Sequence, residues 1–360
     1  MDSRLDFHSH QQFLQSLAHA RPLLTGAANP LVLYDDDPDG LSSFLMVYKT
    51  IRRGNHYPIK TSPSLGPIFL KKISEHAPDL VVVLDKPLLD EAFVRGLELH
   101  HIPLLWFDHH EKEPISSTFI SLYNPHDYGI TNYPTSQIIY YLLEDKRLLW
   151  IACIGTLGDW TLPLFIDDAK RSFPELFGQY TTPQDLLFAS PWKKPIQLFG
   201  LVHKLPSPQY KKAVGLLLEV ESVYELIDET TSHAKKLWSM VQSVQEQYEY
   251  LLSQAKAQPL QDGMRIFTYE GNGNSFTKEL SNELLYCFPH DLILVGRIHQ
   301  GQIKLSLRSS NLPLRAAVTQ ALQGIAGHGG GHEYACGAGM DVEMFPLFLR
   351  QLRAALSLKK

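Results

Sequence analysis

Short runs of apolar, β-rich residues alternate with segments of helical periodicity along the first half of the chain. The clearest apolar runs cover residues 30–34, 80–84 and 102–107. Runs of this length between helical patterns are typical of βα units that build a parallel sheet. The pattern therefore predicts an α/β fold for the N-terminal half, with these three runs as strands of one parallel sheet.

Each of the three predicted strands runs directly into an aspartate, at Asp35, Asp85 and Asp108. The carboxyl ends of parallel strands lie along one edge of a sheet, which is where α/β folds place their chemistry. A fourth acid, Asp159, ends a long apolar run that predicts a buried helix. Small residues in this run, such as Gly155, would let the helix approach its neighbours closely. We therefore expect the four acids to converge on one edge of the sheet.

The pattern changes after residue 160. Residues 161–208 are rich in proline and aromatic residues with weak periodicity, which predicts an irregular elaboration of the first domain. Residues 237–258 carry apolar positions at helical spacing with no internal glycine or proline, which predicts a long helix. Residues 264–271, 291–300 and 301–310 then show the pattern of strands. The C-terminal part is therefore expected to be a second α/β unit.

These patterns divide the chain into three parts. We predict a parallel-sheet α/β domain at 1–210, a helical linker at 211–260 and a smaller α/β domain at 261–360. A chain of 360 residues exceeds what one hydrophobic core usually serves, which also favours two domains. A cleft between the domains is where a binding site would be expected.

The composition is that of an ordinary soluble globular protein. Apolar residues make up 44% of the chain and charged residues 20%, and the net charge is −5. An acidic total does not exclude nucleic acid, because bound cations or a local basic groove can hold phosphates. The cysteines, at positions 153, 287 and 336, form no CxxC pair and are too few for a disulfide framework. Because no stretch reaches the roughly 18 apolar residues of a membrane span, we expect a cytoplasmic protein with no membrane partner.

An acidic cluster directly follows the first predicted strand, in the sequence Asp35-Asp36-Asp37-Pro38-Asp39-Gly40. Four carboxylates in five positions repel one another, so a stable fold needs cations there or wide exposure to solvent. Aspartate, proline and glycine are also common in turns. These residues alone favour a metal site and a solvated acidic turn about equally.

The sequence Asp108-His109-His110 changes this balance. Carboxylate and imidazole together suit Mn2+, Fe2+ or Zn2+ better than Ca2+. Asp85 and Asp159, taken singly, would be an ordinary loop residue and helix-end residue, but all of these acids are expected on the same edge. Six or seven nitrogen and oxygen ligands are too many for one metal ion and suit a pair. The sequence therefore predicts a two-metal site.

The motifs together resemble the DHH phosphoesterase family, which is named for the sequence found here at 108–110. The C-terminal sequence Gly329-Gly330-Gly331-His332, followed by Ala335-Cys336-Gly337, resembles the signature of the family's associated substrate-binding domain. The resemblance covers most of the chain. It rests on five segments in the order of the family's motifs, at 35–40, 84–85, 108–110, 155–159 and 329–337.

The resemblance implies two Mn2+ ions, with Mg2+ or Co2+ as substitutes, and a water between them that attacks phosphorus. One metal would be held by Asp35, Asp37 and Asp85, and the other by Asp39, Asp85, His109 and Asp159. His110 would contact the phosphoryl oxygens or assist proton transfer, and Asp108 would orient a neighbouring histidine.

The C-terminal domain is expected to hold the rest of the substrate. Consecutive glycines at Gly329, Gly330 and Gly331 would let a binding loop approach phosphate closely, with His332 beside them. A flexible loop is the alternative. Arg308 and Ser309, at the end of a predicted strand, would bind a terminal phosphate. A solvated surface arginine is the alternative for Arg308.

Two positions depart from the family pattern. Many members have a histidine two residues before the paired aspartates of the first motif, whereas this chain has Asp35, which is similar to the bacterial RecJ exonuclease type. The second motif usually continues with a small residue, and Lys86 follows Asp85 here. A lysine there could bind phosphate or point away from the site, and we expect it to point away.

The leading functional hypothesis is a phosphodiesterase that cleaves single-stranded DNA or RNA, or short oligonucleotides, from an end. The chain is shorter than full bacterial RecJ enzymes, which favours short substrates. One alternative is hydrolysis of a dinucleotide or a small phosphoester. The other is a non-catalytic scaffold, similar to the replicative-helicase subunit of this family, although each expected metal ligand is present. Whether the chain forms a homo-oligomer is left open by the sequence.

Overall fold

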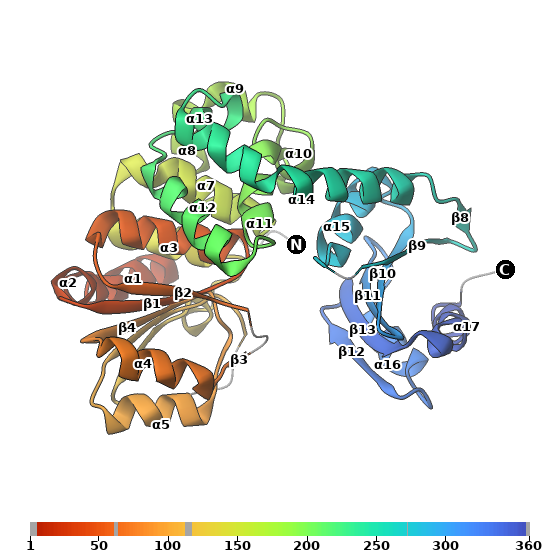
Figure 1. Ribbon diagram of the computed structural model, residues 1–360, viewed down its shortest axis with the longest axis horizontal. Helices are drawn as coiled ribbons and strands as arrows, with labels where there is room; N and C mark the ends of the chain where they lie inside the picture. The colour runs from red at the N-terminus through yellow and green to blue at the C-terminus, as the bar shows by residue number, and fades with distance from the viewer. Residues whose placement is uncertain (1–5, 61–63, 112–116, 272, 358–360) are drawn as a thin grey trace. The chain divides into compact units, whose positions relative to one another are not determined.

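The computed structural model describes residues 6–60, 64–111, 117–271 and 273–357. The chain divides into two compact units, residues 1–241 and 242–360 (Figure 1). Each unit has a β-sheet of its own, and the boundary lies within helix α14 (Ser232–Lys256). The predicted α/β fold with a parallel sheet in the N-terminal part is confirmed. Among the helices described, none has both the length and the apolar character needed to cross a membrane.

The sheet of the first unit has five strands, all parallel, in the order β2-β1-β4-β6-β7. The chain moves from β1 to one side of the sheet and then returns to the other side at β4. Such a reversal leaves a crevice at the carboxyl ends of β1 and β4, and ligands of open α/β sheets bind in a crevice of this kind. The strands are β1 (Pro30–Asp35), β2 (Asn55–Ile59), β4 (Leu80–Leu84), β6 (Leu104–Phe107) and β7 (Ile120–Tyr123).

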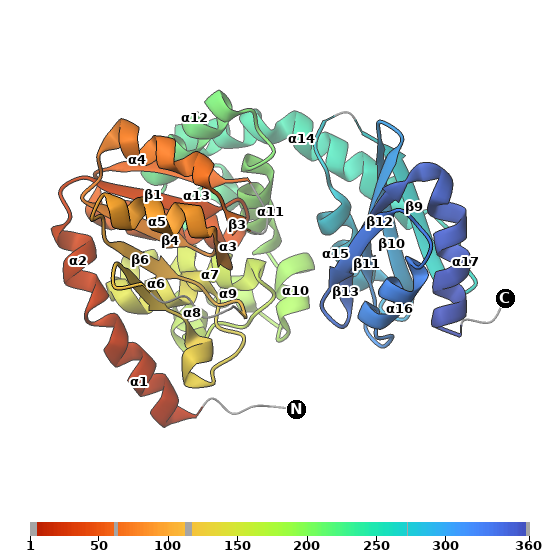
Figure 2. The same ribbon diagram turned by 90° about the horizontal axis from the view of Figure 1, so that it is seen from below.

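Helices cover both faces of this sheet (Figures 1 and 2). Helices α4 (Leu70–His76) and α5 (Glu91–Leu99) pack on one face over a core that includes Val81, Val83 and Trp106. Three helices lie together on the other face. They are α3 (Pro38–Ile51), α6 (Thr135–Leu143) and α7 (Leu149–Gly158). The other α-helices and strands described before residue 130 are α1 (Phe7–Leu17), α2 (Ala20–Gly26), β3 (Ser64–Leu65) and β5 (Leu88–Leu89).

Helix α7 approaches α3 and α6 closely, as its small residues predict. A Cβ atom at Gly155 would lie 2.5 Å from the Cβ of Ser136 on α6 and 2.8 Å from the Cβ of Ser42 on α3. Only glycine allows this separation of the three backbones. The close packing fixes the end of α7, and therefore the position of Asp159, which follows it directly.

The prediction that residues 161–208 are irregular is wrong, because most of this segment is helical. The helices are short, and prolines at Pro174 and Pro183 begin two of them. Proline suits the first turn of a helix, where no hydrogen-bond donor is needed, so these prolines start helices that they seemed to interrupt. The helices of this part of the chain are α8 (Ile166–Ser172), α9 (Pro174–Phe177), α10 (Pro183–Phe188), α11 (Lys193–Val202), α12 (Ser207–Glu219) and α13 (Val223–Asp228).

The second unit is built on a six-stranded sheet in the order β12-β13-β11-β10-β9-β8. Strands β9 and β10 are parallel, and the other neighbours are antiparallel. Helices α16 (Arg315–Ala321) and α17 (Phe345–Ala355) bury one face, and α15 (Thr277–Cys287) packs on β10 and β11. The strands are β8 (Leu260–Gln261), β9 (Met264–Glu270), β10 (Leu292–His299), β11 (Gln302–Arg308), β12 (Gly327–Gly331) and β13 (Ala335–Asp341).

Candidate metal site

The acidic cluster that follows β1 forms the tight entry into helix α3. Asp37 is the N-cap of this helix, and its Oδ1 accepts hydrogen bonds from the backbone N–H groups of Asp39, at 3.0 Å, and Gly40, at 3.1 Å. A Cβ atom at Gly40 would lie 2.5 Å from the carbonyl oxygen of Asp35, so this turn requires glycine. The same turn exposes Asp36 and buries Asp39.

Asp39 is 1% exposed, and the beginning of helix α6 holds its carboxylate. One oxygen accepts a hydrogen bond from the backbone N–H of Thr135 at 2.8 Å, and the other accepts one from that of Ser136 at 2.9 Å. A helix N-terminus favours negative charge, so α6 fixes and partly compensates this buried acid. The hydroxyl of Thr135 also donates to Oδ1 of Asp85 at 3.2 Å. No sequence motif points to these two α6 residues.

Asp85 is buried at the end of β4, and it lies close to the histidine of the third motif. Nε2 of His109 is 3.4 Å from Oδ1 of Asp85 and 3.7 Å from Oδ2 of Asp159. The backbone of Asp85 has a φ of 60°, a left-handed conformation that is uncommon outside glycine and costs conformational energy. Packing of the surrounding strands holds Asp85 in this conformation, and its N–H donates to the carbonyl of Phe107.

The predicted metal ligands are brought together at this edge of the sheet. Within each of three groups, the ligand atoms lie within 4.8 Å of one another. One group consists of carboxylates alone, and the other two combine carboxylate oxygens with one or two imidazole nitrogens, a donor set that fits Mn2+ or another first-row divalent ion. The groups are Asp35, Asp37 and Asp85; Asp39, His109 and Asp159; and Asp85, His109 and His110.

Burial changes the acid–base behaviour of these side chains. It raises the pKa of Asp85 to about 7, with a further contribution from the charge of Asp37. Burial together with the charge of Asp85 raises the pKa of Asp39 to about 7. Burial alone would lower the pKa of His109, but the hydrogen bond and charge of Asp85 and the charge of Asp159 raise it well above its usual range. A nearby positive charge would therefore stabilise the ionised form of the buried carboxylates, and a divalent cation would supply that charge.

Asp108 is fully buried and holds His110 in place. Its Oδ1 lies 2.9 Å from Nδ1 of His110, and its Oδ2 accepts the backbone N–H of the same residue at 3.0 Å. Asn124 donates to the carbonyl oxygen of His110 at 3.0 Å, a contact that the sequence did not predict. If Nδ1 carries the proton in this contact, Nε2 of His110 is the nitrogen that can accept a hydrogen bond. The His110 side chain is 38% exposed, which allows it to meet a ligand.

The expectation that Lys86 points away from the site is wrong. Its side chain is 2% exposed, and its Nζ donates to Oδ1 of Asp35 at 2.7 Å. A buried position is rare for lysine unless a carboxylate pairs with it, and Asp35 is that carboxylate. Chain order alone gives no sign of this pair, because Asp35 ends β1 whereas Lys86 follows β4.

His203 is a further residue that the sequence did not indicate. It follows α11 closely, is 5% exposed and packs its ring against Tyr210. Burial lowers the pKa of His203 to about 3, although the negative charge of Asp37 acts to raise it. Its ring is therefore neutral at physiological pH and adds no positive charge beside the acidic cluster.

The predicted substrate-binding residues of the second unit lie at the ends of β11 and β12, on either side of the start of β13, which pairs with both strands. Arg308 ends β11, and its guanidinium donates to the Asn282 side chain at 2.7 Å and to the carbonyl of Leu307 at 2.9 Å. Ser309 is buried, and its Oγ accepts the backbone N–H of Leu312 at 3.0 Å. The Ser309 hydroxyl therefore shapes the turn that follows β11.

The glycine run does not form a loop, contrary to the prediction. Gly329, Gly330 and Gly331 belong to β12, an edge strand paired with β13. A Cβ atom at Gly329 would lie 2.7 Å from Leu322, whereas one at Gly330 would meet open space. His332 follows the strand, is exposed, and its N–H donates to the carbonyl of Ala335. The run therefore presents a strand edge with little side-chain cover.

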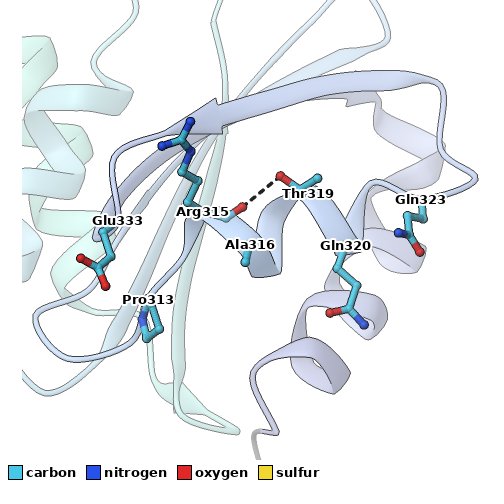
Figure 3. A pocket seen from close by; sticks show the side chains of 7 residues that line it. All are labelled: Pro313, Arg315, Ala316, Thr319, Gln320, Gln323 and Glu333. Atoms are coloured by element: carbon cyan, nitrogen blue, oxygen red, sulfur yellow. Dashed lines mark hydrogen bonds between the residues drawn. The ribbon is translucent and has the colours of Figure 1, made fainter. Parts of the chain in front are cut away.

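A groove of about 760 Å³ lies along the outer side of α16 in the second unit (Figure 3). None of the residues predicted to bind substrate or metal lines it. Its lining consists of Pro313, Arg315, Ala316, Thr319, Gln320, Gln323 and Glu333.

Comparison with known proteins identifies the second unit and the fold. Residues 270–358 match the DHHA1 domain family. No curated protein matches the chain in sequence. A structure of RecJ from Thermus thermophilus in complex with Mn2+ shares the fold with a TM-score of 0.67 and 18% identity. The match covers 96% of this chain but only 55% of that protein, so this chain spans about half of the relative's length.

Two further structures share the fold over nearly their whole length. One is a pGpG-specific phosphodiesterase, PggH, from Vibrio cholerae, at a TM-score of 0.50 and 13% identity, with 92% of this chain and all of that chain covered. The other is CDC45 from Entamoeba histolytica, at a TM-score of 0.52 and 9% identity, with 98% of each chain covered.

Proposed function

We propose that this chain, a DHH-family protein with a C-terminal DHHA1 domain, is a divalent-metal-dependent phosphodiesterase that acts on single-stranded nucleic acid or short oligonucleotides. The observation that carries the proposal is the convergence of Asp37, Asp39, Asp85, His109 and Asp159 at one sheet edge. The DHHA1 match and the fold shared with RecJ and with PggH support the same reaction class. Mn2+ is the proposed cofactor, because the donor set combines imidazole with carboxylate.

The residues of the site divide into metal ligands and residues that act on the substrate. Divalent cations held by these acids and His109 would lower the pKa of a bound water and stabilise charge on the phosphate. His110 is partly exposed beside this cluster and is held through Nδ1 by buried Asp108, so its Nε2 can exchange a proton with a phosphoryl oxygen or leaving group. Thr135 and Ser136 hold Asp85 and Asp39 at fixed positions.

In the second unit we propose that Arg308, His332 and the strand edge at Gly330 contact the part of the substrate away from the cleaved bond. An arginine suits phosphate because its planar guanidinium can donate two parallel hydrogen bonds. Gly330 has no atom within 4 Å of its missing side chain, so a backbone or phosphate can approach it closely. Arg308 is already oriented by Asn282, which reduces the entropy lost on binding.

A scaffold without activity is the competing proposal, and the fold shared with CDC45 motivates it. The presence of all the expected metal-ligand residues argues against a scaffold. A scaffold alone does not require buried carboxylates such as Asp39 and Asp85, whose pKa burial raises to about 7. A dinucleotide hydrolase, motivated by the fold of PggH, remains within the same reaction class and differs only in substrate length.

One assay separates these proposals. Labelled DNA and RNA, from dinucleotides to long single strands, would be incubated with the full chain and Mn2+ and compared with His109→Ala and the exposed-residue control His100→Ala. We expect cleavage in the wild type and the control, and a loss of at least about 100-fold in His109→Ala. Cleavage restricted to dinucleotides would favour the PggH-like alternative, and no cleavage of any substrate would contradict the proposed activity.

A further inference from the structure

Lys86 places a fixed positive charge inside the acidic cluster. Its Nζ lies 2.7 Å from Oδ1 of Asp35, and its side chain is 2% exposed. The backbone around it is held on both sides: the indole N–H of Trp106 donates to the carbonyl oxygen of Lys86 at 2.8 Å, and the preceding residue, Asp85, is held to Phe107. Because Trp106 belongs to the core of the sheet, this hydrogen bond ties the main chain of Lys86 to that core.

The carboxylate that Lys86 contacts also belongs to one of the three metal-binding groups. Asp35, Asp37 and Asp85 have ligand atoms within 4.8 Å of one another. A metal ion bound by all three would share the Asp35 carboxylate with the ammonium group, and two cations on one carboxylate repel each other strongly in a partly buried site. The hydrogen bond from Lys86 goes to Asp35, which is not a member of the second group, of Asp39, His109 and Asp159.

We propose that Lys86 acts as a built-in cation that neutralises Asp35 and keeps it out of metal coordination. This positioning residue makes the two halves of the site unequal. The group of Asp39, His109 and Asp159, together with Asp85, binds one divalent ion tightly. The other half keeps only Asp37 and Asp85 as carboxylate ligands and binds a second ion weakly. The inference rests on the proposed metal-dependent function but concerns binding rather than catalysis.

The unequal site has a consequence for how the protein responds to metal concentration. A tight ion would be present at low Mn2+, and the second would bind only when the concentration rises or when a substrate phosphate supplies additional oxygen ligands. Because Lys86 keeps Asp35 from the second ion, the substrate would supply part of that ion's coordination. The Lys86 ammonium group would also attract the negative charge of the substrate.

The test is a calorimetric titration of Mn2+ into the full chain after chelator treatment, for the wild type, Lys86→Met and the control Lys71→Met. Methionine keeps much of the length of the lysine side chain without its charge, and Lys71 is an exposed lysine of α4 whose side chain is 80% exposed. We expect one tight and one weak Mn2+ per wild-type chain. Removing the Lys86 charge should tighten the weak site by about tenfold or more, and Lys71→Met should leave both sites unchanged.

A second variant keeps the inference testable if Lys86→Met does not fold, as judged by circular dichroism. Asp35→Asn should retain the tight ion, because Asp35 is not among its ligands. If the wild type bound two ions tightly and Asp35→Asn lost one of them, Asp35 would be a metal ligand and the inference would be overturned. A folded Lys86→Met with unchanged or weaker Mn2+ binding would also overturn it. Because the readout is binding, metal that binds as expected without any hydrolysis would contradict only the proposed function, whereas absence of all Mn2+ binding would contradict both.

Discussion

At the scale of single residues, the site depends on carboxyl groups that are buried in the metal-free chain. Asp39 and Asp85 are 1% and 2% exposed, and burial raises the pKa of each to about 7. In the unfolded chain an aspartate ionises near its ordinary pKa of about 4. The folded, metal-free chain therefore binds more protons than the unfolded chain between these values, and its stability must fall as pH rises through this window.

This linkage gives a prediction for chelator-treated protein. The midpoint of thermal unfolding of the first unit should be lower at pH 8 than at pH 5, by at least about 5 °C. Saturating Mn2+ should remove or reverse this difference, because the bound ion stabilises the ionised carboxylates. Differential scanning calorimetry at the two pH values measures both effects. The same pH dependence with and without Mn2+ would show that Asp39 and Asp85 do not meet the metal.

A second prediction concerns the pair of Asp108 and His110. Asp108→Asn keeps the size of the side chain but removes its charge, so it should no longer hold the Nδ1 proton of His110 as firmly. The rate of phosphodiester hydrolysis should fall about 100-fold, while the number of bound Mn2+ ions stays the same. The exposed acid Asp167, changed to asparagine, is the matched control. If Asp108→Asn lost a metal ion as well, Asp108 would be a ligand rather than a positioning residue.

The sequence predicted the acids of the site better than the residues that hold them. Asp35, Asp85 and Asp108 each follow a strand, so their meeting on one edge follows from the rule for parallel sheets. Thr135 and Lys86 carry no such signal, because their roles depend on side chains that approach from elements distant in the sequence. A proline before Thr135 indicates a helix start, but not that the helix would begin at a buried carboxylate.

At the scale of elements, helix α7 positions Asp159 through its close contact with α3 and α6. Gly155 makes this contact, since a Cβ atom there would lie 2.5 Å from Ser136. Gly155→Ala should therefore lower the free energy of unfolding by about 1–3 kcal/mol and weaken Mn2+ binding, because the end of α7 must move. The contrasting variant is Gly215→Ala in α12, where nothing lies within 4 Å of the added methyl group.

Gly215→Ala should instead raise the free energy of unfolding by about 0.5–1 kcal/mol, through the higher helix propensity of alanine. Chemical denaturation of the two variants beside the wild type gives both values. A Gly155→Ala variant as stable as the wild type would show that α7 can shift without cost and that the packing of Gly155 does not fix Asp159.

The element that sequence patterns described least well is the segment 161–208. Its helices are four to ten residues long, which is too short for apolar periodicity to be clear. The triple-glycine run was misjudged for a different reason. Glycine favours loops locally, but hydrogen bonding between β12 and β13 makes it an edge strand, and such pairing cannot be inferred from local composition.

At the scale of the whole molecule, two separate cores imply two separable unfolding events. The proposed metal ligands all lie between residues 35 and 159 of the first unit. Mn2+ should therefore raise the midpoint of only one of two calorimetric transitions, by mass action on the folded state. Leu294→Ala, in the core of the second sheet, should lower the other transition, with a loss of about 2–5 kcal/mol. A single transition that moves with both changes would contradict independent cores.

The proposed function requires the acidic edge of the first sheet to be a hydrolytic metal site. The most direct test is the initial rate of phosphodiester hydrolysis on a short single-stranded oligonucleotide as Mn2+ is titrated, for the wild type and Asp85→Asn. We expect a rate that saturates with Mn2+ and falls at least about 100-fold in the variant, because Asp85 belongs to two of the three metal-binding groups. A rate that does not depend on Mn2+, or a variant as active as the wild type, would contradict it.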